Sequence, residues 1–386
     1  MKAVLTGRGT HLPEGVLTNA DVAARVDPSR LSDFVATNAW CRARTTDLRA
    51  DGERTTEAGA LARRVFADFV ATRVGIRERR VIDRDALLRD EAPSAGLYAS
   101  DLGVVAAQRA LADAEVAAAD VDVVVCGTST PDALCPSTAV RIQRRLGADR
   151  GYAFDVMAAC TSFAYSITIA GALVDSGAVR RALVVSAEYF SAMADWSDPE
   201  SAYFAGDGAA AVLLEAPELV SPRRGLDVVD TLCWSRHSES IRTGMGGTRL
   251  LVANRARGLA APVAPGDDAY PYFHQDGPQV YRDVLPGVEH AVTTLLARRG
   301  VAPSSVARWW VHQASLPMLD GIFARLLGRR PGPEVAPLAL ETTGNTSSCG
   351  AAYCLATDRG LAPGEHGVLL AFGGGYTVGA ALLRGR

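Results

Sequence analysis

The stretch Asp155-Val156-Met157-Ala158-Ala159-Cys160-Thr161-Ser162-Phe163 joins an apolar segment to a run of small residues. The pattern predicts a strand over 152–156 and a helix over 161–176, so that Cys160 falls at the turn between them. A thiol at the start of a helix lies near the positive end of the helix dipole, which favours the reactive thiolate. A lone cysteine is more often a buried core residue, but this strand–turn–helix setting favours a nucleophile.

The same order of elements recurs near the carboxyl terminus. Thr128 ends a buried strand 32 residues before Cys160, and His312 ends another strand 33 residues before Asn345. Cys160 and Asn345 are each followed by a segment of small residues, then by a strand, and then by a second strand that begins after glycines. The paired segments are 121–128 and 306–312, 182–185 and 368–371, and 206–214 and 373–383. This repeat indicates a duplicated α/β unit.

The fold expected from this pattern is layered α/β, because strands that alternate with helices form mainly parallel sheets covered by helices. We predict two related halves, 1–215 and 225–386, with prolines marking the joint. Residues 27–66 are predicted to form a helical insertion and 250–269 a surface loop. The alternative is a single doubly wound nucleotide-binding domain with a cap, but the sequence completes no phosphate-binding glycine motif.

The composition narrows the possible partners and locations. The 386 residues carry 40 basic and 43 acidic side chains, a balance that favours neither nucleic acid nor an anionic membrane surface. Seven cysteines without a CxxC pair predict no disulfide framework and no metal site. The amino terminus lacks a signal-peptide pattern, and the longest apolar run, 163–174, is too short to span a bilayer. The expected location is the cytoplasm.

Two further segments are candidates for the chemistry of Cys160. His312 ends its strand and Asn345 opens its small-residue segment, so the duplication brings both toward Cys160. Cysteine, histidine and asparagine suit a nucleophile with proton carriers or oxyanion donors. The glycines at 373–375 allow a main-chain amide to point into the site, as an oxyanion hole requires.

Five motifs in this order carry a resemblance to a known family. They are Asp-Val-Met-Ala-Ala-Cys at 155–160, Phe-Ala-Gly-Asp-Gly-Ala-Ala at 204–210, His-Gln-Ala-Ser at 312–315, Gly-Asn-Thr-Ser at 344–347 and Phe-Gly-Gly-Gly at 372–375. Together with segments 7–13 and 72–80, they resemble beta-ketoacyl-ACP synthase III of the thiolase superfamily. The resemblance covers the chain outside the insertion and the 250–269 loop.

The resemblance implies a five-layered αβαβα fold, a homodimer and a Cys160–His312–Asn345 catalytic set. Cys160 would take an acyl group from a thioester of coenzyme A or acyl carrier protein, with the amides of Cys160 and Gly374 holding the oxyanion. His312 and Asn345 would stabilise the enolate formed when a malonyl-type thioester loses carbon dioxide. No separate cofactor is implied.

The resemblance also suggests the residues that line the acyl pocket and its entrance. Phe372 and Phe204 would line the acyl pocket, and Leu134 and Cys135 would lie where a partner subunit usually completes it. The entrance residues are then Phe69, Arg73 and Arg325.

The chain departs from the family at several of these positions. Pro199 and Pro317 stand where arginines are usual, Phe69 stands where a tryptophan is usual, and Cys135 replaces the usual partner-subunit residue. These departures favour a role in specialised metabolism.

Three other functions remain open at this point. The first is acyl transfer from Cys160 to an alcohol or amine without decarboxylation, although Asn345 stands where such transferases often have an acid. The second is a non-catalytic ketosynthase partner subunit, which would usually lack the nucleophile. The third is a cysteine protease, against which the duplicated architecture argues.

Overall fold

The computed structural model describes residues 3–50, 57–89, 91, 97–244, 247, 270–358 and 360–386. Its main sheet has nine strands in the order β11-β12-β13-β8-β1-β7-β6-β4-β5. The strands are β1 (Val4–His11), β4 (Val123–Gly127), β5 (Tyr152–Val156), β6 (Arg181–Tyr189), β7 (Asp207–Glu215), β8 (Leu226–Ser235), β11 (Val306–Val311), β12 (His366–Gly373) and β13 (Thr377–Gly385). Two-stranded ribbons pair β2 (Gly15–Thr18) with β3 (Glu78–Val81), and β9 (Ile241–Arg242) with β10 (His274–Gln275).

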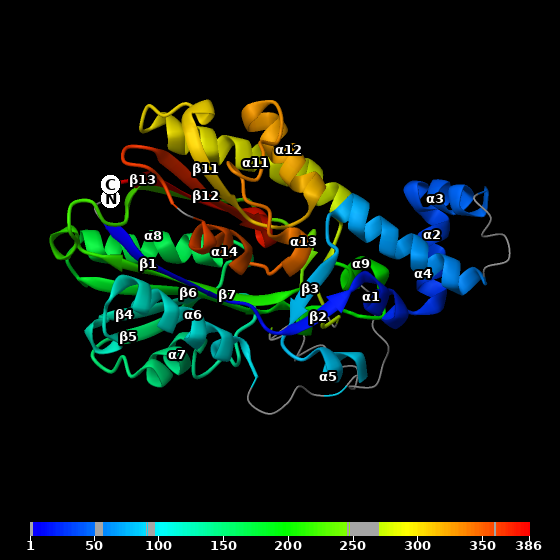
Figure 1. Cartoon of the computed structure of the whole chain (residues 1–386), viewed down its shortest axis with the longest axis horizontal. Coiled ribbons are helices and arrows are strands. Elements are labelled where there is room, and N and C mark those ends of the chain that lie inside the picture. Colours follow the sequence, from blue (N-terminus) through cyan, green and yellow to red (C-terminus); the bar gives the residue numbers. More distant parts are fainter. Residues whose placement is uncertain are drawn as a thin grey trace.

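Helices and strands form five layers (Figure 1). Helices α6 (Ala99–Ala114) and α7 (Thr138–Leu146) pack on the strands of the first half. Helices α11 (Gly277–Ala297) and α12 (Leu316–Leu327) pack on those of the second half. The central layer is α8 (Ser162–Asp175) and α14 (Cys349–Thr357), whose small buried residues share one core with strands of both halves. The duplicated, layered α/β fold is therefore confirmed.

The expected pairing of the strands was partly wrong. The main sheet is mixed, but only three of its eight described pairings are parallel: β4 with β5, β4 with β6, and β11 with β12. Each half ends in an antiparallel pair, β6–β7 and β12–β13. The chain turns back from β12 to β13 through the short segment 374–376, whereas the segment 190–206, which contains α9 (Pro199–Ala202), connects β6 to β7. The two halves join where Val4 and Leu5 pair with Asp227 and Leu226.

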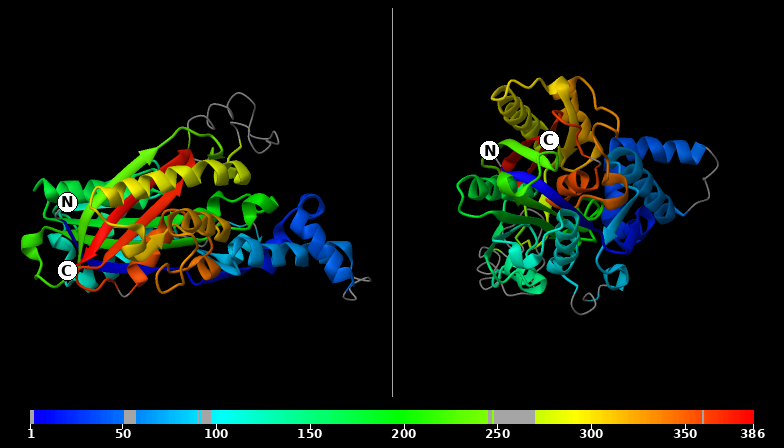
Figure 2. Two further views of the ribbon diagram at one scale, coloured as in Figure 1. Left: turned by 90° about the horizontal axis from the view of Figure 1, so that it is seen from above. Right: turned by 60° about the vertical axis from the view of Figure 1, so that its left-hand side comes forward.

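The predicted insertion is mainly helical where the structure describes it. It contains α2 (Pro28–Thr37), α3 (Ala39–Ala50) and most of α4 (Ala58–Phe69), which project from the layered body beside α1 (Asn19–Arg25) (Figure 2). Asp27 caps α2, since its carboxylate accepts hydrogen bonds from the main-chain amides at Ser29 and Arg30. The 250–269 loop lies outside the described residues, and the boundaries of the two halves remain a prediction.

The remaining helices are short, and they include α5 (Arg84–Arg89), α9 (Pro199–Ala202) and α13 (Leu340–Thr343). Among the described residues, none of the helices is both long enough and apolar enough to cross a membrane.

Candidate active site

Cys160 lies at a tight turn between β5 and α8. Ala159 adopts a left-handed conformation with φ of 48°, which is unusual for a residue with a side chain. The turn is held locally, because the Thr161 hydroxyl donates to the Ala158 carbonyl at 2.6 Å and the Ser162 hydroxyl donates to that of Ala159 at 2.7 Å. The hydroxyl side chains after Cys160 thus fix the backbone that presents the thiol.

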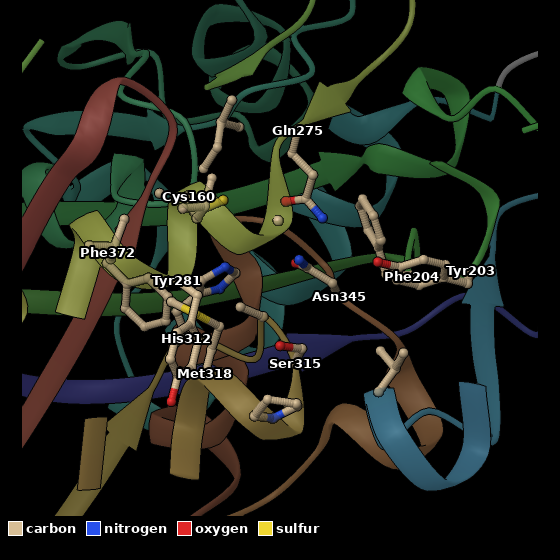
Figure 3. Close-up of a pocket in the computed structure, with 18 of the residues that line it drawn as sticks. Cys160, Tyr203, Phe204, Gln275, Tyr281, His312, Ser315, Met318, Asn345 and Phe372 are labelled. Carbon is tan, nitrogen blue, oxygen red and sulfur yellow. The ribbon is translucent and has the colours of Figure 1, made fainter. Parts of the chain in front are cut away.

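The side chains of Cys160, His312 and Asn345 meet in one cavity of about 410 Å³ (Figure 3). Cys160 precedes α8, His312 follows β11, and Asn345 precedes α14, so the two halves supply different members of the set. A parallel bridge between Ala205 and Asn345 connects the halves at this point. The three residues that the sequence singled out are therefore neighbours, while their roles remain predictions.

The Cys160 thiol differs from the expectation of a ready thiolate. Burial raises the pKa of Cys160 to about 12, and the negative charge of Glu188 acts in the same direction. Hydrogen bonds from the Ser347 hydroxyl and from the main-chain amides of Cys160 and Gly374 lower the pKa of Cys160, but they do not outweigh the burial. Burial therefore favours the neutral thiol, the opposite direction to the one expected from the helix dipole alone.

The same amides bear on the predicted oxyanion hole. The main-chain amides of Cys160 and Gly374 both lie close enough to the sulfur to lower the pKa of the thiol, and their role as oxyanion donors stays a prediction. Gly373 also lies against the nucleophile, because a Cβ atom there would be 2.9 Å from the Cys160 sulfur.

His312 is held as a neutral imidazole. Burial lowers the pKa of His312 to about 4, and a hydrogen bond with the Ser347 main chain opposes this only in part. The ring meets Phe372 edge to face, with centroids 5.3 Å apart. Its Nδ1 atom is buried and has no hydrogen-bond partner among the described residues. A neutral imidazole at this position can donate one hydrogen bond but brings no net charge.

Hydrogen bonds hold Asn345 at its main chain and at the oxygen of its side-chain amide. Its N–H donates to the Phe204 carbonyl at 2.7 Å, and its carbonyl accepts from the Gly206 N–H at 2.9 Å. The side-chain Oδ1 accepts from the Ser347 N–H at 2.9 Å. The amide NH₂ group is therefore the part of Asn345 that remains to donate into the cavity.

The other predicted pocket residues divide into two groups. Phe372 and Phe204 line the cavity. Leu134 is 71% exposed and Cys135 is also exposed, and neither lines the cavity of the single chain. Their predicted place in the pocket of a partner subunit stays a prediction.

The predicted entrance residues also divide. Phe69 and Arg73 line the cavity, at the end of α4 and in the helical turn that follows it. Arg325 does not line it; this residue of α12 is paired with Glu289 of α11 at 2.7 Å on the surface.

Several lining residues were not predicted from the sequence. They are Phe190, Tyr203, Ile241, Phe273, Gln275, Tyr281, Ser315 and Met318, among others. Most are apolar or aromatic residues, some from connections and some from β9, α11 and α12, where no local pattern distinguishes a pocket wall from ordinary core. Gln275 is different, because it is a polar side chain that points into the cavity beside Asn345 (Figure 3).

Comparison with known proteins gives the family. The family model described as 3-Oxoacyl-[acyl-carrier-protein (ACP)] synthase III matches residues 154–226, and the model of the C-terminal part matches residues 296–385. The beta-ketoacyl-[acyl-carrier-protein] synthase III of Bordetella petrii is 31% identical over 386 residues, covering 99% of this chain and 98% of that protein. The corresponding protein of Rhodospirillum rubrum is 32% identical over 389 residues, covering 99% of each.

Solved structures agree with the sequence comparison. The 3-oxoacyl-(acyl carrier protein) synthase III of Pseudomonas aeruginosa PAO1 matches with a TM-score of 0.72 at 27% identity, covering 100% of this chain and 98% of that one. The priming beta-ketosynthase of the R1128 polyketide biosynthetic pathway matches with a TM-score of 0.72 at 25% identity, covering 99% and 96%. The resemblance inferred from the motifs is thus confirmed, and the chain belongs to the beta-ketoacyl-[acyl-carrier-protein] synthase III family, acyltransferases with a thiolase-like fold.

Proposed function

We propose that Cys160 takes an acyl group from an acyl thioester and that the acyl-enzyme condenses with a malonyl-type thioester as carbon dioxide is lost. The observation that carries this proposal is the meeting of Cys160, His312 and Asn345 in one cavity. One nucleophile faces two neutral hydrogen-bond donors there. This set suits two successive reactions at one place, acyl transfer and carbanion attack.

In the first reaction, the sulfur of Cys160 attacks the thioester carbonyl. The carbonyl oxygen becomes negatively charged, and the amides of Cys160 and Gly374, which lie near the sulfur, donate hydrogen bonds to it in this proposal. Loss of one such donor typically costs a factor of about 10²–10³ in rate. The thiol of the donor leaves, and the acyl group remains on Cys160.

In the second reaction, His312 and the NH₂ group of Asn345 hold the thioester oxygen of the malonyl-type substrate. Loss of carbon dioxide places negative charge on that oxygen, and two donors without negative charge stabilise it. The carbanion then attacks the acyl carbonyl, forming a carbon–carbon bond and releasing the Cys160 sulfur. The low pKa of His312, about 4, keeps the imidazole neutral throughout the physiological range.

Simple acyl transfer to an alcohol or amine is the second candidate. Such an acceptor must lose a proton, and a carboxylate near the histidine would normally support the base. The described residues that line the cavity include no aspartate or glutamate. This lining favours condensation over transfer, and the presence of Cys160 argues against a non-catalytic partner subunit.

The proposed enzyme is a homodimer that pairs through the end of the main sheet. β5 is the last strand in the sheet order, and Tyr152, Met157 and Leu134 in and beside it are 48%, 62% and 71% exposed. An apolar edge strand of this kind is ordinarily covered. A second copy would also bring Leu134 and Cys135 to the neighbouring pocket, as the family resemblance implies.

The proposed substrates are thioesters of coenzyme A or acyl carrier protein in specialised metabolism of the polyketide or fatty acid type. Proline at 199 and 317, in place of the family's arginines, supports a donor other than the usual small coenzyme A thioester. The similarity to a polyketide priming ketosynthase is consistent with this role.

The test combines intact-protein mass spectrometry with a carbon dioxide assay. The protein is mixed with a panel of acyl thioesters, and a mass increase that is absent from Cys160→Ala identifies the acyl donor. Addition of malonyl thioester should then release carbon dioxide and remove the adduct. An acylated alcohol without carbon dioxide release would favour transfer, and no adduct across the panel would favour a non-catalytic subunit.

A further inference from the structure

Glu188 is a fully buried carboxylate behind the active site. It lies on β6, an otherwise mainly apolar strand, and is 0% exposed. Its carboxylate accepts from the hydroxyls of Ser129 at 2.9 Å and Thr130 at 2.7 Å, and from the hydroxyl of Ser348. The main-chain amides of Ser129 and Ser348 donate as well, at 3.1 and 3.3 Å. These partners come from both halves, so Glu188 sits at their junction.

A chain of hydroxyl groups connects Glu188 to the nucleophile. The Ser129 hydroxyl donates to Glu188 and lies 2.8 Å from the Ser347 hydroxyl. The Ser347 hydroxyl in turn lies 3.8 Å from the sulfur of Cys160. Ser129 and Ser347 are 218 residues apart in the chain, and the fold brings them together behind the cavity.

The number of hydrogen atoms in this chain is informative. The path has three contacts, sulfur to Ser347, Ser347 to Ser129, and Ser129 to Glu188, but its two hydroxyls supply only one hydrogen each. All three contacts are hydrogen bonds only when one more proton is present, on the thiol or on the carboxyl group. With that proton on Cys160 every hydroxyl points toward Glu188, and with it on Glu188 every hydroxyl points toward Cys160.

We propose that Cys160 and Glu188 share one proton through the hydroxyls of Ser347 and Ser129, and that Glu188 holds the thiol proton while Cys160 carries the acyl group. Glu188 is then a positioning residue, because it acts on the sulfur only through the two serines. This inference rests on the proposed role of Cys160 as nucleophile. Glu188 also provides an acceptor for the thiol proton. His312 is a weak acceptor for that proton, because its pKa is about 4.

The proton can be followed through both reactions. When the sulfur forms its bond to the acyl carbon, the thiol proton moves to Ser347, the Ser347 proton to Ser129, and the Ser129 proton to Glu188. The bond between the acyl carbon and the donor sulfur breaks, and the donor thiolate takes a proton from water. After condensation the Cys160 thiolate leaves the acyl carbon, and the same hydroxyls return the Glu188 proton to it.

The surroundings favour one shared proton over two negative charges. Burial raises the pKa of both Glu188 and Cys160, and the charge of Glu188 raises that of Cys160 further. The other titratable groups on which the Glu188 charge acts are Cys126 of β4, Asp207 of β7 and Cys349 of α14. The pKa of each of these is raised chiefly by burial, to about 7 for Asp207, so the two thiols stay neutral from about pH 7 to about pH 9 while Asp207 titrates at the lower end of that range.

The test measures alkylation of Cys160 by iodoacetamide, followed by peptide mass spectrometry, from about pH 7 to about pH 9. This assay needs no acyl substrate, so its outcome is independent of which thioester the enzyme uses. If Cys160 and Glu188 hold one shared proton throughout this range, the fraction of molecules with a Cys160 thiolate and a protonated Glu188 does not depend on pH. The alkylation rate of the wild-type protein then changes less than about twofold over this range. In Glu188→Gln the rate should rise about tenfold per pH unit, as expected for an isolated thiol below its pKa.

Asp207→Asn is the matched control. Asp207 is also fully buried on a strand of the first half and accepts from the hydroxyl and amide of Ser191, but among the described residues no chain of hydroxyls connects it to Cys160. This variant should keep the flat profile of the wild type. A wild-type rate that itself rises tenfold per pH unit, or a flat profile that survives in Glu188→Gln, would overturn the proposal.

A second variant covers the case in which Glu188→Gln does not fold. Ser129→Ala removes one hydroxyl from the path but keeps the main-chain amide that donates to Glu188. It should show the same steep profile, and a flat profile in this variant would also refute the shared proton.

Discussion

Gly373 packs directly against Cys160, and no side chain fits between them. A Cβ atom at Gly373 would lie 2.8 Å from the Cβ of Cys160 and 2.9 Å from its sulfur. Contacts this short require one of the two to move. The glycine therefore sets the position of the nucleophile and of the Gly374 amide next to it.

The Gly373→Ala variant should consequently lose acyl loading. The displaced sulfur and amide no longer match the developing oxyanion, and we expect a loss of about 10²-fold in the rate of acyl-enzyme formation. Rapid-mixing mass spectrometry of the adduct measures this rate. Gly59→Ala on α4, where the nearest described atom would be 4.0 Å away, is the control and should load normally.

Asn345→Asp should separate the two reactions. The aspartate keeps an oxygen to accept from the Ser347 N–H, but it replaces the donating NH₂ group with a negative charge. We expect acyl loading to remain while decarboxylation of the malonyl thioester falls by at least about 10²-fold. Asn345→Ala removes the donor without adding charge and should lose less. Equal losses in both variants would contradict a role in stabilising an enolate.

His312 should make folding stability depend on pH. Its pKa is 6.5 when unfolded and about 4 when folded, so the unfolded chain binds the proton first as the pH falls. Stability from this residue is present above pH 6.5 and is lost between pH 6.5 and 4, by about 3 kcal/mol in total. Denaturant unfolding at several pH values measures the loss. The loss should be smaller in His312→Gln, which has no titrating side chain at this position.

Trp40 should influence the entrance through Phe69. The Trp40 ring lies 5.9 Å from that of Phe69, which lines the cavity, so α3 of the insertion supports the cavity wall. Aromatic pairs contribute about 0.5–1.5 kcal/mol beyond area burial, and Trp40→Ala should raise KM for acyl thioesters about two- to tenfold. Arg49→Ala, an exposed change on the same helix, should leave KM unaltered.

Tyr152 should matter for association of two copies. Tyr152→Glu places a charge on the exposed edge strand and should shift the protein from dimer to monomer, because a buried unpaired charge is costly at an interface. Sedimentation velocity measures the shift. Tyr272→Glu replaces a tyrosine that is 37% exposed elsewhere and should remain a dimer. A monomeric wild-type protein would contradict the proposed assembly.

The sequence predicted the repeat and the three central side chains because both depend on short local signals. Valine-rich strands, small-residue helices and glycines recur at matched spacings, and Cys160, His312 and Asn345 stand at the ends of these elements. Strand direction was less predictable, because the length of a connection does not decide whether the next strand runs parallel or antiparallel: residues 190–206 connect β6 to β7, and residues 374–376 connect β12 to β13. The antiparallel β6–β7 and β12–β13 pairs show this.

The pocket wall and the Glu188 network were beyond local patterns. Tyr203 and Phe273 come from connections and Gln275 from the two-residue strand β10, and the positions of all three depend on the whole fold. The raised pKa of Cys160 was beyond local patterns as well, because burial depends on tertiary packing, whereas the helix dipole is local. One signal was available for Glu188, since a carboxylate in the otherwise apolar run at 182–188 indicates a buried charge with dedicated partners.

The bridge between Ala205 and Asn345 has a consequence for the order of folding. Cys160 and Ser129 belong to the first half of the chain, whereas His312, Asn345 and Ser347 belong to the second. An intermediate in which only one half has formed holds a thiol without its donors, or donors without a thiol. Enzymatic competence therefore requires that the halves dock, which makes acyl loading a reporter of that step of folding.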